Sequence, residues 1–103
     1  MFSTKSFSAE KIELVAFVLK TIAHPMRIAI IDILKDEKEL TVNEICKRLN
    51  DADQSLVSHN LANMKYKGVL GSRREGRNIY YHLKLMEVLS VLDCMEKCDL
   101  KLR

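Results

Sequence analysis

The sequence predicts a mainly helical domain that carries one small β-hairpin. Three observations support this fold class. Apolar residues recur at helical spacing in several segments, and these segments begin at good capping residues. A short polar turn at Asn50–Ala52 separates two of the helical segments. A basic stretch of alternating residues surrounds Gly76, and glycine readily adopts the positive φ that tight hairpin turns require.

The chain of 103 residues is long enough for a single domain, which we expect to span residues 1–103. A chain this short leaves apolar surface in water, so its high aliphatic content favours packing against a second copy. The net charge is only +3, but positive charge is concentrated after position 64. We expect a cytoplasmic protein, because we find no signal peptide, no run of bilayer length and no disulfide pattern among three cysteines.

The first two helices are expected at residues 9–22 and 25–34. Ser8 can cap the first helix, which is apolar over most of its circumference, so more than one surface should cover it. Pro25 stands in the first turn of the second helix, where proline is tolerated. The residues expected on the buried side of the second helix are Ile28, Ile31 and Leu34.

The next two helices are predicted to form a helix–turn–helix. Thr41 and Glu44 have the spacing of a capping box, which starts a short helix that ends at Leu49. After the turn, Asp53 can cap a fourth helix that ends near Gly68. One side of the fourth helix is apolar, and the opposite side carries mostly small polar groups. The apolar side consists of Val57, Leu61 and Met64, and the opposite side of Ser55, His59, Ala62 and Tyr66.

Two strands at 69–74 and 78–83, joined by a turn at Glu75-Gly76, and a last helix at 84–100 complete the chain. Of two adjacent tyrosines in the second strand, one should pack under the hairpin and the other remain accessible. This order of elements is that of a winged helix-turn-helix with five helices. The methionines expected in the core are Met64, Met86 and Met95.

Four short motifs occur in a fixed order between residues 19 and 83. They are Leu19-Lys-Thr-Ile-Ala-His-Pro-Met-Arg-Ile, Leu40-Thr-Val-Asn-Glu-Ile, Gln54-Ser-Leu-Val-Ser-His-Asn-Leu and Arg73-Arg-Glu-Gly-Arg-Asn-Ile-Tyr-Tyr-His-Leu. Together they resemble the ArsR/SmtB family of bacterial transcriptional repressors. The resemblance implies a homodimer that binds an inverted repeat in promoter DNA, with the first and last helices as the interface. The residues implied there are Ile12, Val15, Leu19, Leu85, Val88, Leu92 and Met95.

We expect double-stranded DNA to be bound by the helix at 53–67 and the wing at 69–83. Small polar side chains leave room for base edges, and arginines in the wing suit phosphates. The alternatives are a solvated surface histidine and a charged strand edge that resists aggregation. The expected base contacts are Gln54, Ser55, Ser58, His59 and Asn63. The expected contacts with the DNA backbone are Lys65, Lys67, Arg73, Arg74 and Arg77.

The two metal sites known from the family lack their ligands in this sequence. Thr41 and Asn43 replace a Cys-x-Cys pair, and Leu85 replaces a carboxylate that would bind zinc. We therefore expect no metal ion and no other cofactor. Cys94 and Cys98 lie four residues apart on the last helix, where they are either small packed apolar residues or a thiol switch or soft-metal clip between subunits.

A regulator of transcription, and in particular a repressor, is the principal hypothesis. No Ser-His-Asp grouping, phosphate loop or carboxylate pair indicates an enzyme. One alternative is a sensor that releases DNA when its thiols are oxidised or bind a soft metal. The other is a winged-helix module for protein contact, but a docking helix normally presents aromatic or aliphatic anchors, and we expect none on the polar face from Ser55 to Asn63. The sequence identifies neither the operator nor an inducer.

Overall fold

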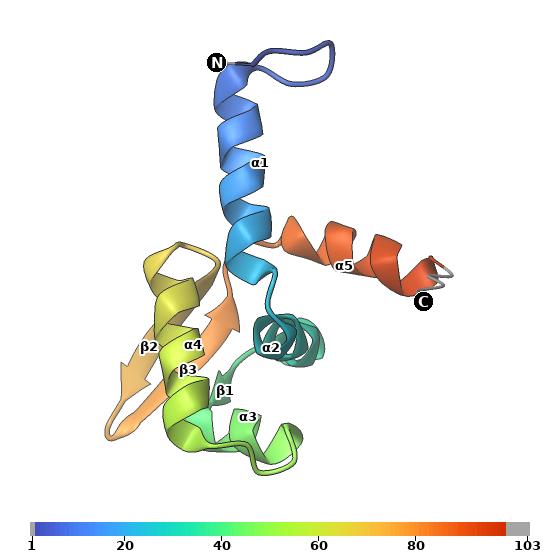
Figure 1. The fold of residues 1–103 in the computed structure, drawn as a ribbon. Helices are drawn as coiled ribbons and strands as arrows, with labels where there is room; N and C mark the ends of the chain where they lie inside the picture. The colour runs from blue at the N-terminus through green and yellow to red at the C-terminus, as the bar shows by residue number, and fades with distance from the viewer. Residues whose placement is uncertain (1, 99–103) are drawn as a thin grey trace.

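The structure, a computed structural model, describes residues 2–98. These residues form five helices and three strands (Figure 1). The predicted order of elements is confirmed, with one short strand added before the third helix. In chain order the elements are α1 (Ala9–Ile22), α2 (Pro25–Asp36), β1 (Leu40–Thr41), α3 (Val42–Arg48), α4 (Gln54–Tyr66), β2 (Leu70–Glu75), β3 (Asn78–Leu83) and α5 (Val88–Lys97).

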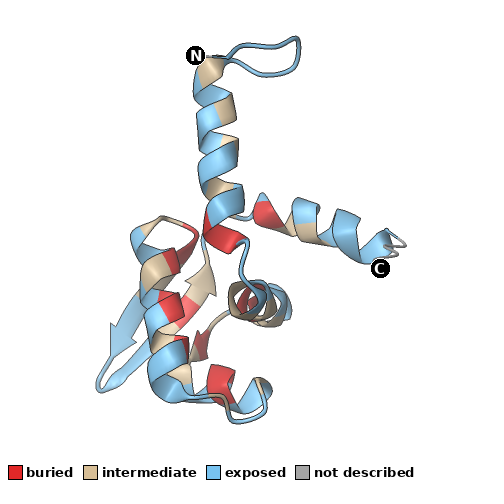
Figure 2. Cartoon of the chain, in the orientation of Figure 1, coloured by how far each residue is buried: buried red, intermediate tan, exposed pale blue. Residues whose placement is uncertain are grey.

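The core lies where α2, α3 and α4 pack together and against the sheet (Figure 2). Each helix contributes one apolar face, as its helical spacing predicted. The end of α1 and the first residue of α5 reach the same core. Its buried residues are Ile22, Ile30, Ile31, Leu34, Leu40, Ile45, Cys46, Val57, Leu61, Met64, Val69, Leu70, Tyr81 and Val88.

The three strands form an antiparallel sheet in the order β1-β3-β2. Leu40 of β1 pairs with Tyr81, and the hairpin register begins with Leu70 opposite Leu83. Tyr81 is buried and Tyr80 is half-exposed, so the predicted alternation is confirmed. The sequence did not predict β1, because a two-residue strand has no periodicity of its own and forms only against a distant partner.

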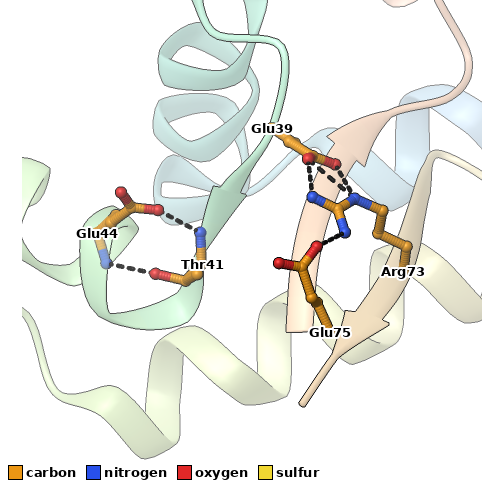
Figure 3. Close-up of polar contacts among 5 residues, drawn as sticks. All are labelled: Glu39, Thr41, Glu44, Arg73 and Glu75. Carbon is orange, nitrogen blue, oxygen red and sulfur yellow. Dashed lines mark hydrogen bonds and ion pairs between the residues drawn. The ribbon is translucent and has the colours of Figure 1, made fainter. Parts of the chain in front are cut away.

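The predicted helix starts are confirmed by their caps. The side chains of Ser8 and Asp53 each accept a hydrogen bond from the backbone N–H three residues later, at 3.1 Å. Thr41 and Glu44 form a complete capping box (Figure 3). The N–H of Glu44 donates to the Thr41 hydroxyl at 3.2 Å, and the N–H of Thr41 donates to the Glu44 carboxylate at 2.8 Å. These are local interactions, which is why the sequence could predict them.

The hairpin turn lies one residue later than predicted. Glu75 pairs with Asn78 across the strands, so the loop consists of Gly76 and Arg77 rather than Glu75 and Gly76. Gly76 has a φ of +62°, whereas Arg77 has a negative φ. A positive φ at the first loop position alone is typical of a type II′ turn, which matches the twist of antiparallel strands.

Two other helix boundaries differ from the prediction. α2 ends at Asp36, two residues later than expected. α5 begins at Val88 instead of residue 84. The two residues after β3 both donate their N–H groups to the carbonyl of Val69 at 3.0 Å, which holds this segment against the core before the helix can start. The predicted helix end at Leu100 lies outside the described residues.

Three apolar residues that we expected in the core are exposed in the single chain. Ile28 is 40% exposed, Met86 57% and Met95 47%. The prediction was wrong for these residues because helical periodicity identifies side chains that share a face. It does not determine how much of that face the neighbouring elements cover.

α1 and α5 project away from the body of the molecule (Figure 1). The axes of α1 and α2 differ by 95°, and the radius of gyration of 15.2 Å exceeds the value of about 13 Å expected for a compact domain of this length. Only Thr21 and Ile22 of α1 are buried. The chain itself therefore leaves most of α1 uncovered. The expectation that more than one partner surface covers this helix stays a prediction.

Among the described residues no single helix is long and apolar enough to cross a membrane. Only α1 and α2 taken together, as a bent pair, reach the necessary length and composition.

Candidate nucleic-acid interface

The orientation of α4 is fixed by its apolar stripe. Val57, Leu61 and Met64 are completely buried, as predicted. They pack among residues of α2, α3 and the sheet, so α4 cannot rotate about its axis without exposing them. Burying three such side chains contributes about 1.5–3 kcal/mol each to folding. The opposite side of α4 must therefore point into solvent.

Most of the predicted base-contacting residues lie on this outward side. Gln54, Ser55 and His59 are exposed, and Ser58 is half-buried at the edge of the surface. Asn63 is different, because its Oδ1 is buried and has no hydrogen-bond partner within residues 2–98. The structure thus brings Gln54, Ser55, Ser58 and His59 together on one outer surface and turns the amide oxygen of Asn63 away from it.

Two exposed residues add apolar character to α4, and sequence reasoning missed the first of them, Leu56. Leu56 is 49% exposed at the edge of the polar face that we expected to lack aliphatic anchors, so that expectation was wrong at this position. Tyr66, at the end of the helix, is 90% exposed, as its predicted place on the outward side requires. On a helical wheel Leu56 lies beside Asn63, at the edge of the outward side, and this position could have identified it. Its methyl groups are suited to contact with a thymine methyl group.

Asn60 is a buried polar residue that the sequence analysis also missed. It lies three residues after Val57 and four before Met64, so its place on the buried side was readable from the spacing. Its side-chain oxygen accepts a hydrogen bond from Nε of Arg27 at 2.8 Å, and its amide donates to the carbonyl of Leu56 at 2.9 Å. Nη1 of Arg27 donates to the carbonyl of Thr21 at 3.0 Å. This network ties α4 to the junction between α1 and α2.

The basic side chains differ in how free they are. Lys65 on α4 and Arg77 at the hairpin tip are exposed. Arg74 is also exposed and donates from Nε to the carbonyl of Gly76 at 3.3 Å. Lys67 is half-buried, and its ammonium group lies 5.9 Å from the centroid of the Phe17 ring on α1. These four residues retain a positive group that a phosphate could reach.

Arg73, by contrast, is already paired within the protein (Figure 3). Its Nε lies 2.9 and 3.0 Å from the two carboxylate oxygens of Glu39, and its Nη1 lies 2.6 Å from Glu75. The hydrogen bonds that Arg73 donates to Glu39 and, to a lesser extent, to Glu75 raise the pKa of Arg73, and the bond to Glu39 lowers the pKa of Glu39. The guanidinium therefore keeps its proton, and the carboxylates of Glu39 and Glu75 balance its positive charge.

The three thiols are in different environments. Cys94 and Cys98 are exposed, so the single chain does not pack them as apolar residues. Cys46 is buried, and burial, together with the charges of Asp53 and Asp51, raises the pKa of its thiol. In residues 2–98, no three His, Cys, Asp or Glu side chains are grouped so that they could hold a metal ion.

The residues predicted at a dimer interface are only partly available. Leu19 and Met95 are exposed, and Ile12, Val15, Leu85 and Leu92 are half-buried. Val88 is 1% exposed and belongs to the core of its own chain. Other exposed apolar residues of α1 and α5, which the prediction omitted, are Leu14, Phe17 and Val91. An apolar groove of about 240 Å³ separates the two helices.

A helix–turn–helix whose second helix turns a polar face outward, followed by a basic hairpin, is typical of DNA-binding winged helix-turn-helix regulators. Residues 24–70, from the start of α2 to the start of β2, match the family model described as "Bacterial regulatory protein, arsR family". The chain belongs to the ArsR family, as the four sequence motifs indicated. It is a DNA-binding regulator of transcription rather than an enzyme.

Two relatives illustrate the similarity. The transcriptional repressor PagR of Bacillus anthracis is 40% identical over 77 residues, which cover 75% of this chain and 76% of PagR. Its crystal structure gives a TM-score of 0.76 at 36% identity, covering 85% of this chain and 99% of that one. The transcriptional activator HlyU of Vibrio cholerae is 31% identical over 80 residues, 78% of this chain and 72% of HlyU. Its structure gives a TM-score of 0.78 at 28% identity, covering 87% and 96%.

Proposed function

We propose that the protein is a homodimeric repressor that binds an inverted repeat in promoter DNA through α4 and the wing formed by β2 and β3. The observation that carries the proposal is the two-sided character of α4. Its apolar stripe is completely buried, while Gln54, Ser55 and His59 point into solvent. A helix held in this way can enter the major groove with its polar side toward the bases.

Hydroxyl, amide and imidazole groups supply the base contacts in this proposal. Gln54 has the geometry for a bidentate contact with adenine, and Ser55 and Ser58 can bond to either type of base. His59 is exposed beside them. The methyl groups of Leu56 add an apolar contact with thymine. Asn63 is the weakest of the five predicted contacts, because its side-chain oxygen is buried.

Phosphate contacts supply most of the affinity in this proposal. Lys65, Lys67, Arg74 and Arg77 flank the polar side of α4 or lie on the wing, and each retains an accessible positive group. Each phosphate that a cation neutralises releases counterions on binding. Each such contact therefore adds about −0.9 to the slope of the logarithm of the binding constant against the logarithm of the salt concentration. Binding should therefore weaken steeply as salt rises.

We place the dimer interface on α1 and α5, which are otherwise left uncovered. Leu14, Phe17 and Leu19 are between 44% and 58% exposed, and Val91 and Met95 are 40% and 47% exposed. Monomeric proteins rarely leave so many large apolar side chains in water. A two-fold dimer through these helices would present two copies of α4 to successive major grooves, about 34 Å apart.

The role of α4 can be tested once a binding screen of genomic fragments has identified an operator. Replacing Ser58 or His59 by Ala should cost about 1–3 kcal/mol on the operator and little on random DNA of the same length. Asn43→Ala, an exposed polar change on α3, serves as the matched control and should leave both affinities unchanged. Equal losses on operator and random DNA would contradict the role of these residues in reading the sequence.

The dimer can be tested by sedimentation. Leu14→Glu places a charge in the proposed interface at a side chain that is 58% exposed in the single chain, so the fold should survive while the dimer dissociates. Leu56→Glu, at the far end of α4 from α1, is the control and should remain dimeric. A Leu14→Glu variant that still sediments as a dimer would move the interface elsewhere.

A thiol-dependent inducer site is the second candidate, because Cys94 and Cys98 are both exposed and lie one helical turn apart. Oxidation or a thiophilic metal ion would lower the affinity for DNA in this hypothesis. Operator titrations before and after alkylation, and with oxidant or cadmium, test it. Unchanged affinity in every case would reject the sensor and leave a repressor without a thiol inducer.

Because its target is chromosomal DNA, we propose that the protein acts in the bacterial cytoplasm.

The direction of regulation can be tested with a reporter gene. A bound dimer would block polymerase if the operator overlaps the promoter. A reporter fused to the promoter should therefore become more active when the gene is deleted. Lower activity on deletion would indicate an activator.

A further inference from the structure

The Arg73 side chain is held by partners on three sides. Two of its nitrogens, Nε and Nη2, bond to the carboxylate of Glu39, and the third, Nη1, bonds to Glu75. The guanidinium carbon lies 4.5 Å from the centroid of the Tyr80 ring, which stacks against its face. Figure 3 shows Glu39 reaching the guanidinium from the segment before β1. A planar guanidinium engaged at all three nitrogens is strongly oriented.

Arg73 and Arg74 are neighbours in β2, so their side chains point to opposite faces of the sheet. Arg73 lies opposite Tyr80 in the hairpin register, whereas Arg74 lies opposite Ile79. The face that includes Arg74 continues into the buried residues that pack against α4. Arg73 therefore lies on the face of the wing that is turned away from α4, the helix proposed to enter the groove.

The charges around Arg73 do not favour a phosphate. One guanidinium and two carboxylates give the cluster one net negative charge. The Glu39 side chain is only 25% exposed, so its carboxylate cannot easily turn away. In contrast, within residues 2–98 neither Arg74 nor Arg77 takes part in an ion pair. The wing thus carries two available arginines and one that the protein neutralises.

We propose that Glu39 and Glu75 withhold Arg73 from DNA, so that Arg73 fixes the wing against β1 while Arg74 and Arg77 bind phosphates. Glu39 is then a specificity-determining residue. It removes one sequence-independent attraction, which would otherwise strengthen binding to every DNA equally. This inference rests on the proposed function, and it changes the prediction from sequence that Arg73 contacts the DNA backbone.

The first test compares three arginine variants on a duplex of random sequence, with salt varied from about 50 to about 200 mM. Arg74→Gln and Arg77→Gln should each make the salt slope shallower by about 0.9, whereas Arg73→Gln should leave it unchanged. If Arg73→Gln changes the slope as much as Arg74→Gln does, the inference is overturned. If Arg74→Gln and Arg77→Gln have no effect while wild type still binds DNA, the proposed wing contact fails instead.

The second test releases Arg73 by removing its main acceptor. Glu39→Gln should steepen the slope by up to about 0.9, so that its gain in random-DNA binding is about threefold larger at the low end of that salt range than at the high end. Removing any carboxylate near the DNA could strengthen binding by reducing repulsion, so Glu39→Gln is also made in the Arg73→Gln background. The gain should disappear there, because no guanidinium remains to be released. A gain that persists would assign the effect to general charge and refute the role of Glu39.

The third test needs no DNA. The hydrogen bond from Arg73 lowers the pKa of Glu39 below the ordinary value of 4.5, so this pair stabilises the fold above that pH. The advantage of wild type over Arg73→Gln in free energy of unfolding should be complete at neutral pH and shrink as the pH falls through the lowered pKa of Glu39, leaving only the contact with Tyr80. The Glu39 carboxyl, titrated by NMR, should return toward 4.5 in Arg73→Gln. An unshifted titration in wild type would overturn the proposal even if DNA binding were never detected.

Discussion

Replacing Asn60 by Ala should destabilise the protein more than any exposed change on α4. Asn60 is 2% exposed, and its side chain accepts a hydrogen bond from the charged Arg27 and donates one to the Leu56 carbonyl. A hydrogen bond to a charged group contributes about 1.5–3 kcal/mol, and one between neutral groups about 0.5–1.5 kcal/mol. The free energy of unfolding should therefore fall by about 2–4 kcal/mol.

Urea unfolding at one fixed protein concentration measures this loss, because dimerisation makes stability depend on concentration. The control is Asn43→Ala, which removes an exposed amide from α3 and should change stability by less than about 0.5 kcal/mol. Asn60→Asp keeps an acceptor for Arg27 and should lose less than Asn60→Ala. In a double-mutant cycle with Arg27→Ala, the two losses should not add, since both changes break the same bond. Additive losses, or a loss from Asn60→Ala no larger than the control, would refute the reasoning.

Two further predictions concern the wing and the thiols. Gly71→Ala should cost about 1–3 kcal/mol in unfolding free energy, because the added Cβ would overlap the His82 imidazole, and this cost should shrink once His82 is also replaced by Ala. A cost that is equal in both backgrounds would place the clash elsewhere. A thiol reagent should modify Cys94 and Cys98 in the native protein and Cys46 only after unfolding, as counted by mass spectrometry. Protection of Cys94 and Cys98 would place them beneath a partner subunit.

Local features of the fold could be predicted well from the sequence. The starts of three helices depend on side chains that bind backbone groups only three residues away. These are the start of α1, the capping box at Thr41 and Glu44, and the cap at Asp53. The buried stripe of α4 follows from helical spacing, and with it the exposure of the opposite side. For that reason most of the proposed DNA-reading surface was visible before the fold was known.

The sequence was less informative where burial depends on neighbouring elements. Met95 and Ile28 occupy apolar positions with helical spacing, yet both are exposed. Met95 lies on α5, which projects from the body (Figure 1), and Ile28 belongs to a part of the apolar face of α2 that is left uncovered. Val88, which shares a stripe with Met95, is buried because it opens α5 beside the core. Spacing alone could not distinguish a residue of the core from one left for a partner.

By itself the sequence determined the order of the elements, the starts of most helices and the polar side of α4, since each depends on residues within about one helical turn. Only the tertiary structure decided that Arg73 is paired and that Asn60 holds Arg27. The residues in these two contacts are 34 and 33 positions apart. Such contacts depend on strand register and on helix packing. A single residue added to a strand would turn its side chains to the opposite face of the sheet and break the contact.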